Sequence, residues 1–215
     1  MKTHELIEKL SQEAPLRQTS RTPAWWAVRL ISVLILYGVG AQFFLGVRPD
    51  IILQFERPFF VLEIILLAGM SISAALASVF VMYPDMYQKP WILKIPYLLF
   101  AALILLLSYQ FAFMAIDIRM VIPPPGGHAM ECALCIGSVA LIPSALIFGI
   151  LRQGASVTPV NAGFLAVLAT TGIGCLILRI AEANDSLMHL VSWHYLPTFI
   201  FASIGAALAK RLLKW

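Results

Sequence analysis

Two short stretches of the chain carry side chains that could bind a metal ion or undergo thiol chemistry. The first holds a Cys-x-x-Cys pair, Cys132 and Cys135, with His128 and Glu131 close by. On a helix, His128, Cys132 and Cys135 lie on one face, because they are spaced i, i+4 and i+7. Two thiols and an imidazole suit a redox pair or a soft metal ion, so these three residues are candidate sensor residues and candidate metal ligands. The alternative is that both cysteines are small apolar residues that pack within a helix.

The second stretch places Asp185, His189 and Trp193 at i, i+4 and i+8, and His194 follows. Asp185 and His189 could pair with each other, or could complete a site with His128 and the cysteines. Ionisable groups near a membrane helix are functional hypotheses by default, so both are candidate sensor residues, and His189 is a further candidate metal ligand. The alternative is that a histidine near a helix end binds a backbone or interfacial group.

Few other residues indicate chemistry. Glu63 could pair with Arg57 or Arg179, and Arg179 could instead form a local ion pair with Glu182. Cys175 falls in the middle of an apolar segment and is expected in the core. The sequence contains no nucleophile elbow, phosphate-binding loop or zinc-protease helix. We therefore expect neither an enzyme nor a bound cofactor.

The composition indicates that these residues are positioned by membrane helices. The chain is 60% hydrophobic and only 12% charged. Six apolar segments have about the length needed to cross a bilayer. They are roughly 24–46, 59–82, 91–115, 130–151, 159–181 and 187–209. The sequence thus predicts an all-α membrane protein with six transmembrane helices in three hairpins, and it divides into a polar arm, 1–23, and a membrane domain, 24–215.

The basic residues predict the orientation of these spans. With the N-terminus inside, nine lysines and arginines lie in inside segments and four in outside segments. The inside set is Lys2, Lys9, Arg17, Arg21, Lys89, Arg152, Lys210, Arg211 and Lys214; the outside set is Arg48, Arg57, Arg119 and Arg179. The positive-inside rule then puts both termini in the cytoplasm. The net charge of +4 does not indicate direct nucleic-acid binding, because the basic residues are scattered over short loops and helix ends.

The residue pattern of the arm predicts a short amphipathic helix. Thr3 can cap it, and Pro15 should end it at Ala14. A helix of about three turns is not stable alone in water, so we expect it to fold against a protein groove, the lipid headgroups or the chain's own loops. The candidate partner-binding residues are Thr3, Glu5, Leu6, Ile7, Glu8 and Leu10.

Several of these motifs, taken in order along the chain, resemble the NrsF family of membrane anti-sigma factors. The resemblance rests on the opening Met1-Lys2-Thr3 with Leu6, Ile7 and Leu10; on Gly46-Val47-Arg48-Pro49-Asp50; on Cys132 with Pro143 and Leu151-Arg152-Gln153-Gly154-Ala155; and on Asp185-Ser186 with Trp193 and the closing Arg211-Leu212-Leu213-Lys214-Trp215.

The resemblance implies a protein of the bacterial inner membrane that sequesters an extracytoplasmic-function sigma factor and releases it on a metal or oxidative signal. Family members pair a cysteine in the fourth span with one just before the Asp-Ser of the last loop. Here Glu182 lies near that second position, so Cys132 and Cys135, with His128 and His189, would take over this role, or the chain senses something else. A homodimer could add to the contact with the partner.

Two other classes of membrane protein remain as alternatives. A thiol-redox protein would use Cys132 and Cys135 directly, but it would normally need a second cysteine pair, and only Cys175 remains. A small-solute carrier would need charges along a central path, and the predicted span interiors are nearly free of charge.

Overall fold

The structure, a computed structural model, describes residues 22–83, 89–113, 129–154 and 156–213, together with His4, Glu5, Glu8 and Lys9. Within these residues there are helices and no strands. The long helices are α2 (Pro23–Leu45), α4 (Pro58–Phe80), α5 (Pro90–Phe113), α7 (Ala129–Leu151) and α8 (Pro159–Ala181), and the last span runs through α9 (Leu187–His189), the π-helical η2 (Leu190–Tyr195) and α10 (Leu196–Leu212). Six segments are long and apolar enough to cross a membrane, which confirms the predicted all-α, six-span architecture.

The boundaries of the long helices follow from their end residues. Pro23, Pro58 and Pro159 each occupy the start of a helix, where a proline removes no intrahelical hydrogen bond. The Thr22 side chain caps α2 by accepting a hydrogen bond from the backbone N–H of Trp25 at 3.3 Å. At the other end of α2, Gly46 has a φ of 78°, a conformation that favours glycine. The chain can therefore turn sharply into α3 (Ile51–Phe55), the short helix before the second span.

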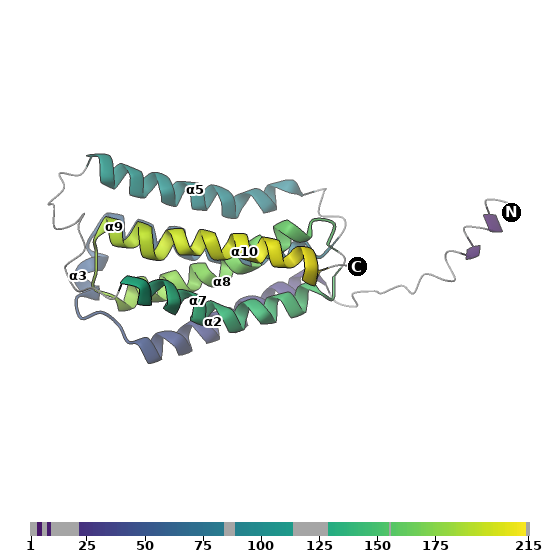
Figure 1. The fold of residues 1–215 in the computed structure, drawn as a ribbon, viewed down its shortest axis with the longest axis horizontal. Coiled ribbons are helices and arrows are strands. Elements are labelled where there is room, and N and C mark those ends of the chain that lie inside the picture. Colours follow the sequence, from purple (N-terminus) through teal and green to yellow (C-terminus); the bar gives the residue numbers. More distant parts are fainter. Residues whose placement is uncertain are drawn as a thin grey trace.

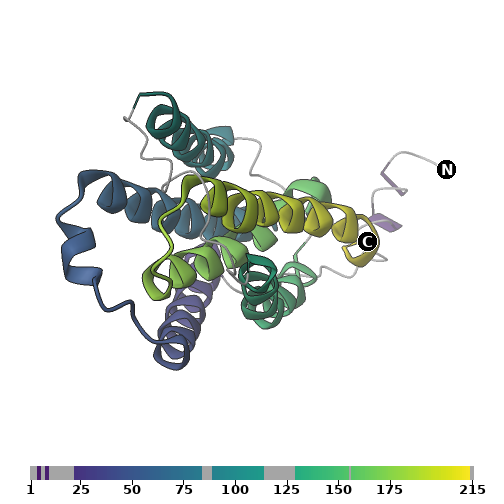
Figure 2. The ribbon, with the colours of Figure 1, turned by 60° about the vertical axis from the view of Figure 1, so that its left-hand side comes forward.

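Helix α8 lies at the centre of the bundle. It packs against α2, α4, α7 and α10, whereas α5 packs mainly against α4 at the edge of the molecule (Figures 1 and 2). About two thirds of the α8 span is buried inside the protein, more than in any other described span. Helix α8 therefore links the polar residues at one end of the bundle to the helix ends at the other.

Helices α8 and α10 approach closely because both carry glycine where they cross. A Cβ atom added at Gly163 would lie 2.4 Å from the carbonyl oxygen of Gly205 and 2.4 Å from the Cβ of Ala209. A Cβ atom added at Gly205 would lie 2.3 Å from Cγ2 of Val167. The small residues of the last span therefore serve packing within the chain, because they allow two helix backbones to touch.

We predict that Gly163→Ala lowers the free energy of unfolding by about 1–3 kcal/mol, because the new methyl group meets backbone rather than a flexible side chain. Gly149→Ala on α7 is the matched control. Apart from the backbone of its own helix, no atom of the described residues lies within 4 Å of its added Cβ, so the helix propensity of alanine should make it neutral or stabilising by up to about 1 kcal/mol. Unfolding of the detergent-solubilised protein by a denaturing detergent, followed by circular dichroism, measures both. Equal stabilities of the two variants would contradict the close approach.

Most of the predicted partner-binding arm lies outside the described residues. This applies to Thr3, Leu6, Ile7 and Leu10. The four described residues of the predicted arm helix, His4, Glu5, Glu8 and Lys9, are helical and exposed. The proposed contact stripe of the arm therefore stays a prediction.

Candidate functional site

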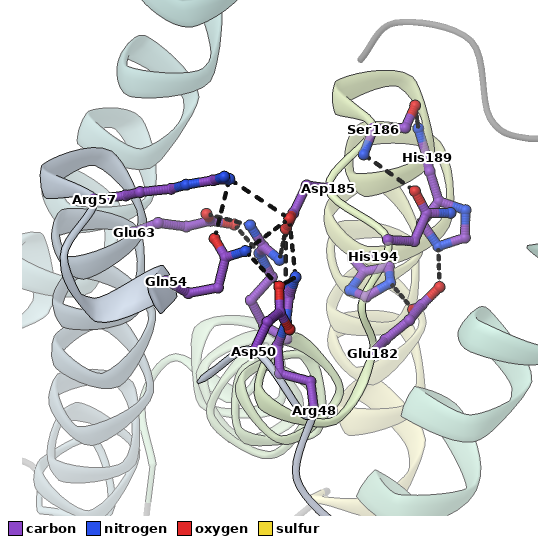
Figure 3. A network of polar contacts seen from close by, with 12 residues as sticks. Arg48, Asp50, Gln54, Arg57, Glu63, Glu182, Asp185, Ser186, His189 and His194 are labelled. Atoms are coloured by element: carbon purple, nitrogen blue, oxygen red, sulfur yellow. Dashed lines mark hydrogen bonds and ion pairs between the residues drawn. The ribbon is translucent and has the colours of Figure 1, made fainter. Parts of the chain in front are cut away.

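Helices α3 and α9 lie at one end of the bundle, opposite the end where α2 begins and α10 finishes (Figure 1). Buried polar side chains gather at the end that carries α3 and α9. They form two neighbouring groups (Figure 3). The ion cluster comprises Arg48, Asp50, Gln54, Glu63, Arg179, Asp185 and Tyr195. The Cys-Glu-His cluster comprises Cys132, Glu182, His189 and His194.

Arg48 holds one side of the ion cluster together. Its guanidinium donates hydrogen bonds of 2.7 and 2.9 Å to the Asp50 carboxylate, and two of 2.9 Å to that of Asp185. Gln54 donates to both carboxylates, at 2.8 and 3.2 Å. The backbone N–H of Arg48 also donates to the carbonyl of Ile180 at 3.0 Å. Arg48 therefore fixes the connection between α2 and α3 against the end of α8. Its side chain is only 1% exposed, so these ion pairs are largely shielded from water.

Arg179 holds the other side. From the last turn of α8 it donates to the Glu63 carboxylate at 2.9 and 3.2 Å and to Asp185 at 2.7 Å. Tyr195 donates a short hydrogen bond to the same Glu63 carboxylate. The guanidinium carbon of Arg179 lies 4.9 Å from the centre of the Phe60 ring, a cation–π contact. The ion cluster thus joins α4, α8 and η2 through buried charges.

The carboxylates outside the spans are held in the charged form. Burial raises the pKa of Asp185, but hydrogen bonds from Arg48 and the charge of Arg179 outweigh it, so the net pKa lies below the ordinary value of about 3.9. The hydrogen bond from Arg48 likewise lowers the pKa of Asp50. A depressed folded-state pKa contributes stability above the ordinary value and loses it only as the pH falls through the folded value. Asp50 and Asp185 therefore stay ionised near neutral pH, and their ion pairs with the arginines persist there.

The Cys-Glu-His cluster is built around the Glu182 carboxylate at the end of α8. The Cys132 thiol lies 3.3 Å from Glu182 Oε2, and His194 Nε2 lies 3.1 Å from the same oxygen. His189 Nε2 lies 3.1 Å from Glu182 Oε1 (Figure 3). Burial raises the pKa of Glu182, but the His194 hydrogen bond and the charge of the two histidines lower it by more, so the net pKa is below its ordinary value.

The π-helical segment η2 explains why two histidines five residues apart reach one carboxylate. Their ring centres are 5.2 Å apart. In an α-helix, two residues that are five positions apart point to different sides. In a π-helix, the backbone hydrogen bonds join residues i and i+5, so the side chains of these residues lie on the same side. Pro197, at the start of α10, has no N–H to donate to the carbonyl four residues earlier, which is compatible with a widened turn there. His194, and not Trp193, therefore lies beside His189.

The structure separates the predicted sensor residues. It brings Cys132 and His189 together, whereas Asp185 belongs to the ion cluster and binds Arg48 and Arg179. Cys135 is half-buried and is not a member of the Cys-Glu-His cluster. His128 lies outside the described residues. Of the partners considered for Glu63, the structure selects Arg179, and Glu182 contacts histidines instead of the suggested Arg179.

Two members of the Cys-Glu-His cluster, Glu182 and His194, were not among the predicted site residues. The signal for Glu182 was its place near a cysteine position of the resembling family. Nothing in the sequence indicated His194, because the 3.6-residue period of an α-helix does not predict which residues share a face in a π-helix.

These features define a multi-pass membrane protein whose buried ionisable groups are gathered at one end of the bundle. The sequence model of the NrsF family, described as negative regulator of sigma F, matches residues 10–215. The chain therefore belongs to the NrsF family, and this confirms the resemblance seen in its motifs. The family description assigns it to the negative regulators of a sigma factor. The chain has no significant match among curated proteins or among solved structures.

Proposed function

We propose that the protein is an anti-sigma factor of the bacterial inner membrane that binds an extracytoplasmic-function sigma factor through its N-terminal arm and releases it on an envelope signal. In this role it needs neither catalysis nor a cofactor of its own. The observation that carries the proposal is the family match over nearly the whole of a six-span chain.

The arm is the part of the chain best suited to hold a soluble partner. It precedes the first span, and Leu6, Ile7 and Leu10 form an apolar stripe on an otherwise polar segment. Burying an aliphatic side chain contributes roughly 1.5–3 kcal/mol before ordering costs. Three such side chains alone give modest affinity, so the basic end of the bundle, with Arg152 and Lys210, or homodimerisation supplies additional contact.

The orientation with both termini in the cytoplasm supports this arrangement. Helix α2 begins and α10 ends at the same end of the bundle (Figure 1). That end carries Arg152, Lys210 and Arg211, and the positive-inside rule assigns it to the cytoplasm. The two polar clusters then face the envelope.

A signal at the envelope end can reach the cytoplasmic end through α8 and α10. Glu182 closes α8, and His194 lies in the same span as α10. At the opposite end, Gly163 touches Gly205 and Arg152 Nε donates to the carbonyl of Leu212 at 3.0 Å. Two packings of these helices with different affinity for the sigma factor would constitute the switch.

The test is a pull-down of the intact protein in mild detergent, with and without residues 1–20, with bound proteins identified by mass spectrometry. We expect a sigma factor to copurify with the full chain and to be lost from the truncated one. Retention of the sigma factor by the truncated chain would overturn the role of the arm. Capture of no sigma factor by either form would favour the thiol-redox or carrier alternative.

A further inference from the structure

The structure points to a divalent-metal site in the Cys-Glu-His cluster, and we propose that Cys132, Glu182, His189 and His194 together bind one zinc ion. The four donors come from the start of α7, the end of α8 and the bent start of the last span. One ligand atom from each lies within 4.8 Å of the others. They therefore lie close together although they come from three different spans or their ends.

Hydrogen bonding within the protein does not satisfy this cluster. Among the residues that the structure describes, His189 Nε2 and His194 Nδ1 are buried and have no hydrogen-bond partner. His189 Nε2 is close to Glu182, but the contact lacks the alignment of a hydrogen bond. The His189 side chain is only 3% exposed. A buried unsatisfied ring nitrogen is costly, and coordination of a metal ion would satisfy His189 Nε2, which already faces Glu182.

The charges of the cluster suit a divalent cation. The neighbouring arginines, Arg48 and Arg179, are occupied by the ion cluster, so Glu182 has no guanidinium partner among the described residues. With Cys132 as thiolate, Glu182 as carboxylate and two neutral imidazoles, the ligands carry two negative charges. A divalent ion makes the site neutral, which lowers the cost of holding it at the membrane edge.

The donor types favour zinc over magnesium or calcium. Magnesium and calcium take oxygen ligands, whereas sulfur and imidazole donors suit zinc, which is usually tetrahedral. Bond lengths of 2.0–2.3 Å place the ligands of a tetrahedral zinc about 3.3–3.7 Å apart. The most distant pairs of the cluster therefore need to close by no more than about 1.5 Å. The Glu182 side chain is 25% exposed and offers the ion a path from water.

Zinc at this position would tie α7, α8 and the last span together at the envelope end. This consequence deepens the proposed function, on which it rests, by naming the four residues that would receive a metal signal. Metal binding itself does not depend on the sigma factor and can be measured without it.

The experiment uses the full-length protein, purified in detergent without a polyhistidine tag and stripped with a chelator. Zinc binding is measured by competition with a chromophoric chelator, and cobalt(II) is used as a spectroscopic probe. We expect one zinc per chain, and a cobalt(II) spectrum with a thiolate charge-transfer band and the intense visible bands of a tetrahedral complex. Binding of no zinc, or a cobalt(II) spectrum without the thiolate band, would overturn the site.

Cys135 provides the matched control for Cys132, because it lies one turn further along the same helix. Cys132→Ser and His194→Gln should each weaken zinc binding by more than about 10-fold, whereas Cys135→Ser should leave it unchanged. Glu182→Gln keeps the shape of the side chain and removes its charge, so it should also weaken binding while preserving the fold. Equal affinities of Cys132→Ser and Cys135→Ser would overturn the assignment. Zinc binding with no sigma factor captured would leave the site standing and refute only the proposed function.

Discussion

Replacing both Leu6 and Leu10 with aspartate is expected to weaken capture of the sigma factor by at least about 100-fold. The two leucines lie on one side of the predicted arm helix, and each contributes roughly 1.5–3 kcal/mol when buried against a partner. Losing both costs about 3–6 kcal/mol, and every 1.4 kcal/mol is a factor of ten in affinity. The dissociation constant of the purified detergent-solubilised complex, measured by titration with the labelled sigma factor, checks this.

Lys9→Gln combined with Gln12→Asp is the matched control for this double variant. It changes the net charge by the same two units, but on the polar side of the predicted helix. We expect its affinity to stay within a few-fold of the parent. If both double variants bind alike, the effect comes from charge alone, and the apolar stripe is not the contact surface.

The six spans could be predicted from the sequence because their signal is local. Each is a predominantly apolar segment of 21–26 residues in the structure, and prolines mark several of the starts. In lipid the backbone N–H and C=O groups must be satisfied within the protein, and a segment of about 20 residues does this as a helix, whereas the strands of a membrane barrel have only about 9–11 residues. The fold class could therefore be predicted without knowing which helices contact each other.

The clusters could not be predicted in the same way, because their contacts join distant parts of the chain. Arg48 binds Asp185, which is 137 positions away, and Cys132 contacts Glu182, which is 50 positions away. Sequence spacing can place Asp185 and His189 on one helical face, but it cannot reveal that Asp185 lies before the helix and binds two arginines. In addition, the α-helical period of 3.6 residues predicts that Trp193 lies on the same face as His189. Because the segment is π-helical, His194 occupies that face instead.

Arg179→Met is expected to lower the free energy of unfolding by about 3–5 kcal/mol. The Arg179 side chain is 5% exposed and that of Glu63 is 3% exposed, so removing the guanidinium leaves a buried carboxylate without its cation. Glu63→Gln should cost less, because Arg179 keeps its 2.7 Å contact with Asp185. Unfolding by a denaturing detergent, followed by circular dichroism, gives the free energies. The double variant, with both charges removed, should be more stable than Arg179→Met alone, because no buried charge is then unpaired.

Arg57→Met is the control for this series, because it removes a guanidinium from the same end of the bundle. The Arg57 side chain is 56% exposed, and its nitrogen lies 3.9 Å from Asp185, so its loss should change stability by less than about 0.5 kcal/mol. Similar decreases in the free energy of unfolding for Arg57→Met and Arg179→Met would contradict a stabilising role of the buried Arg179–Glu63 pair. If the expected order holds, the Arg179–Glu63 pair keeps α8 fixed to α4 at the end of the bundle that carries α3 and α9. Helix movements on signalling would then occur mainly in α7 and in the last span, on the side of α8 that carries Glu182.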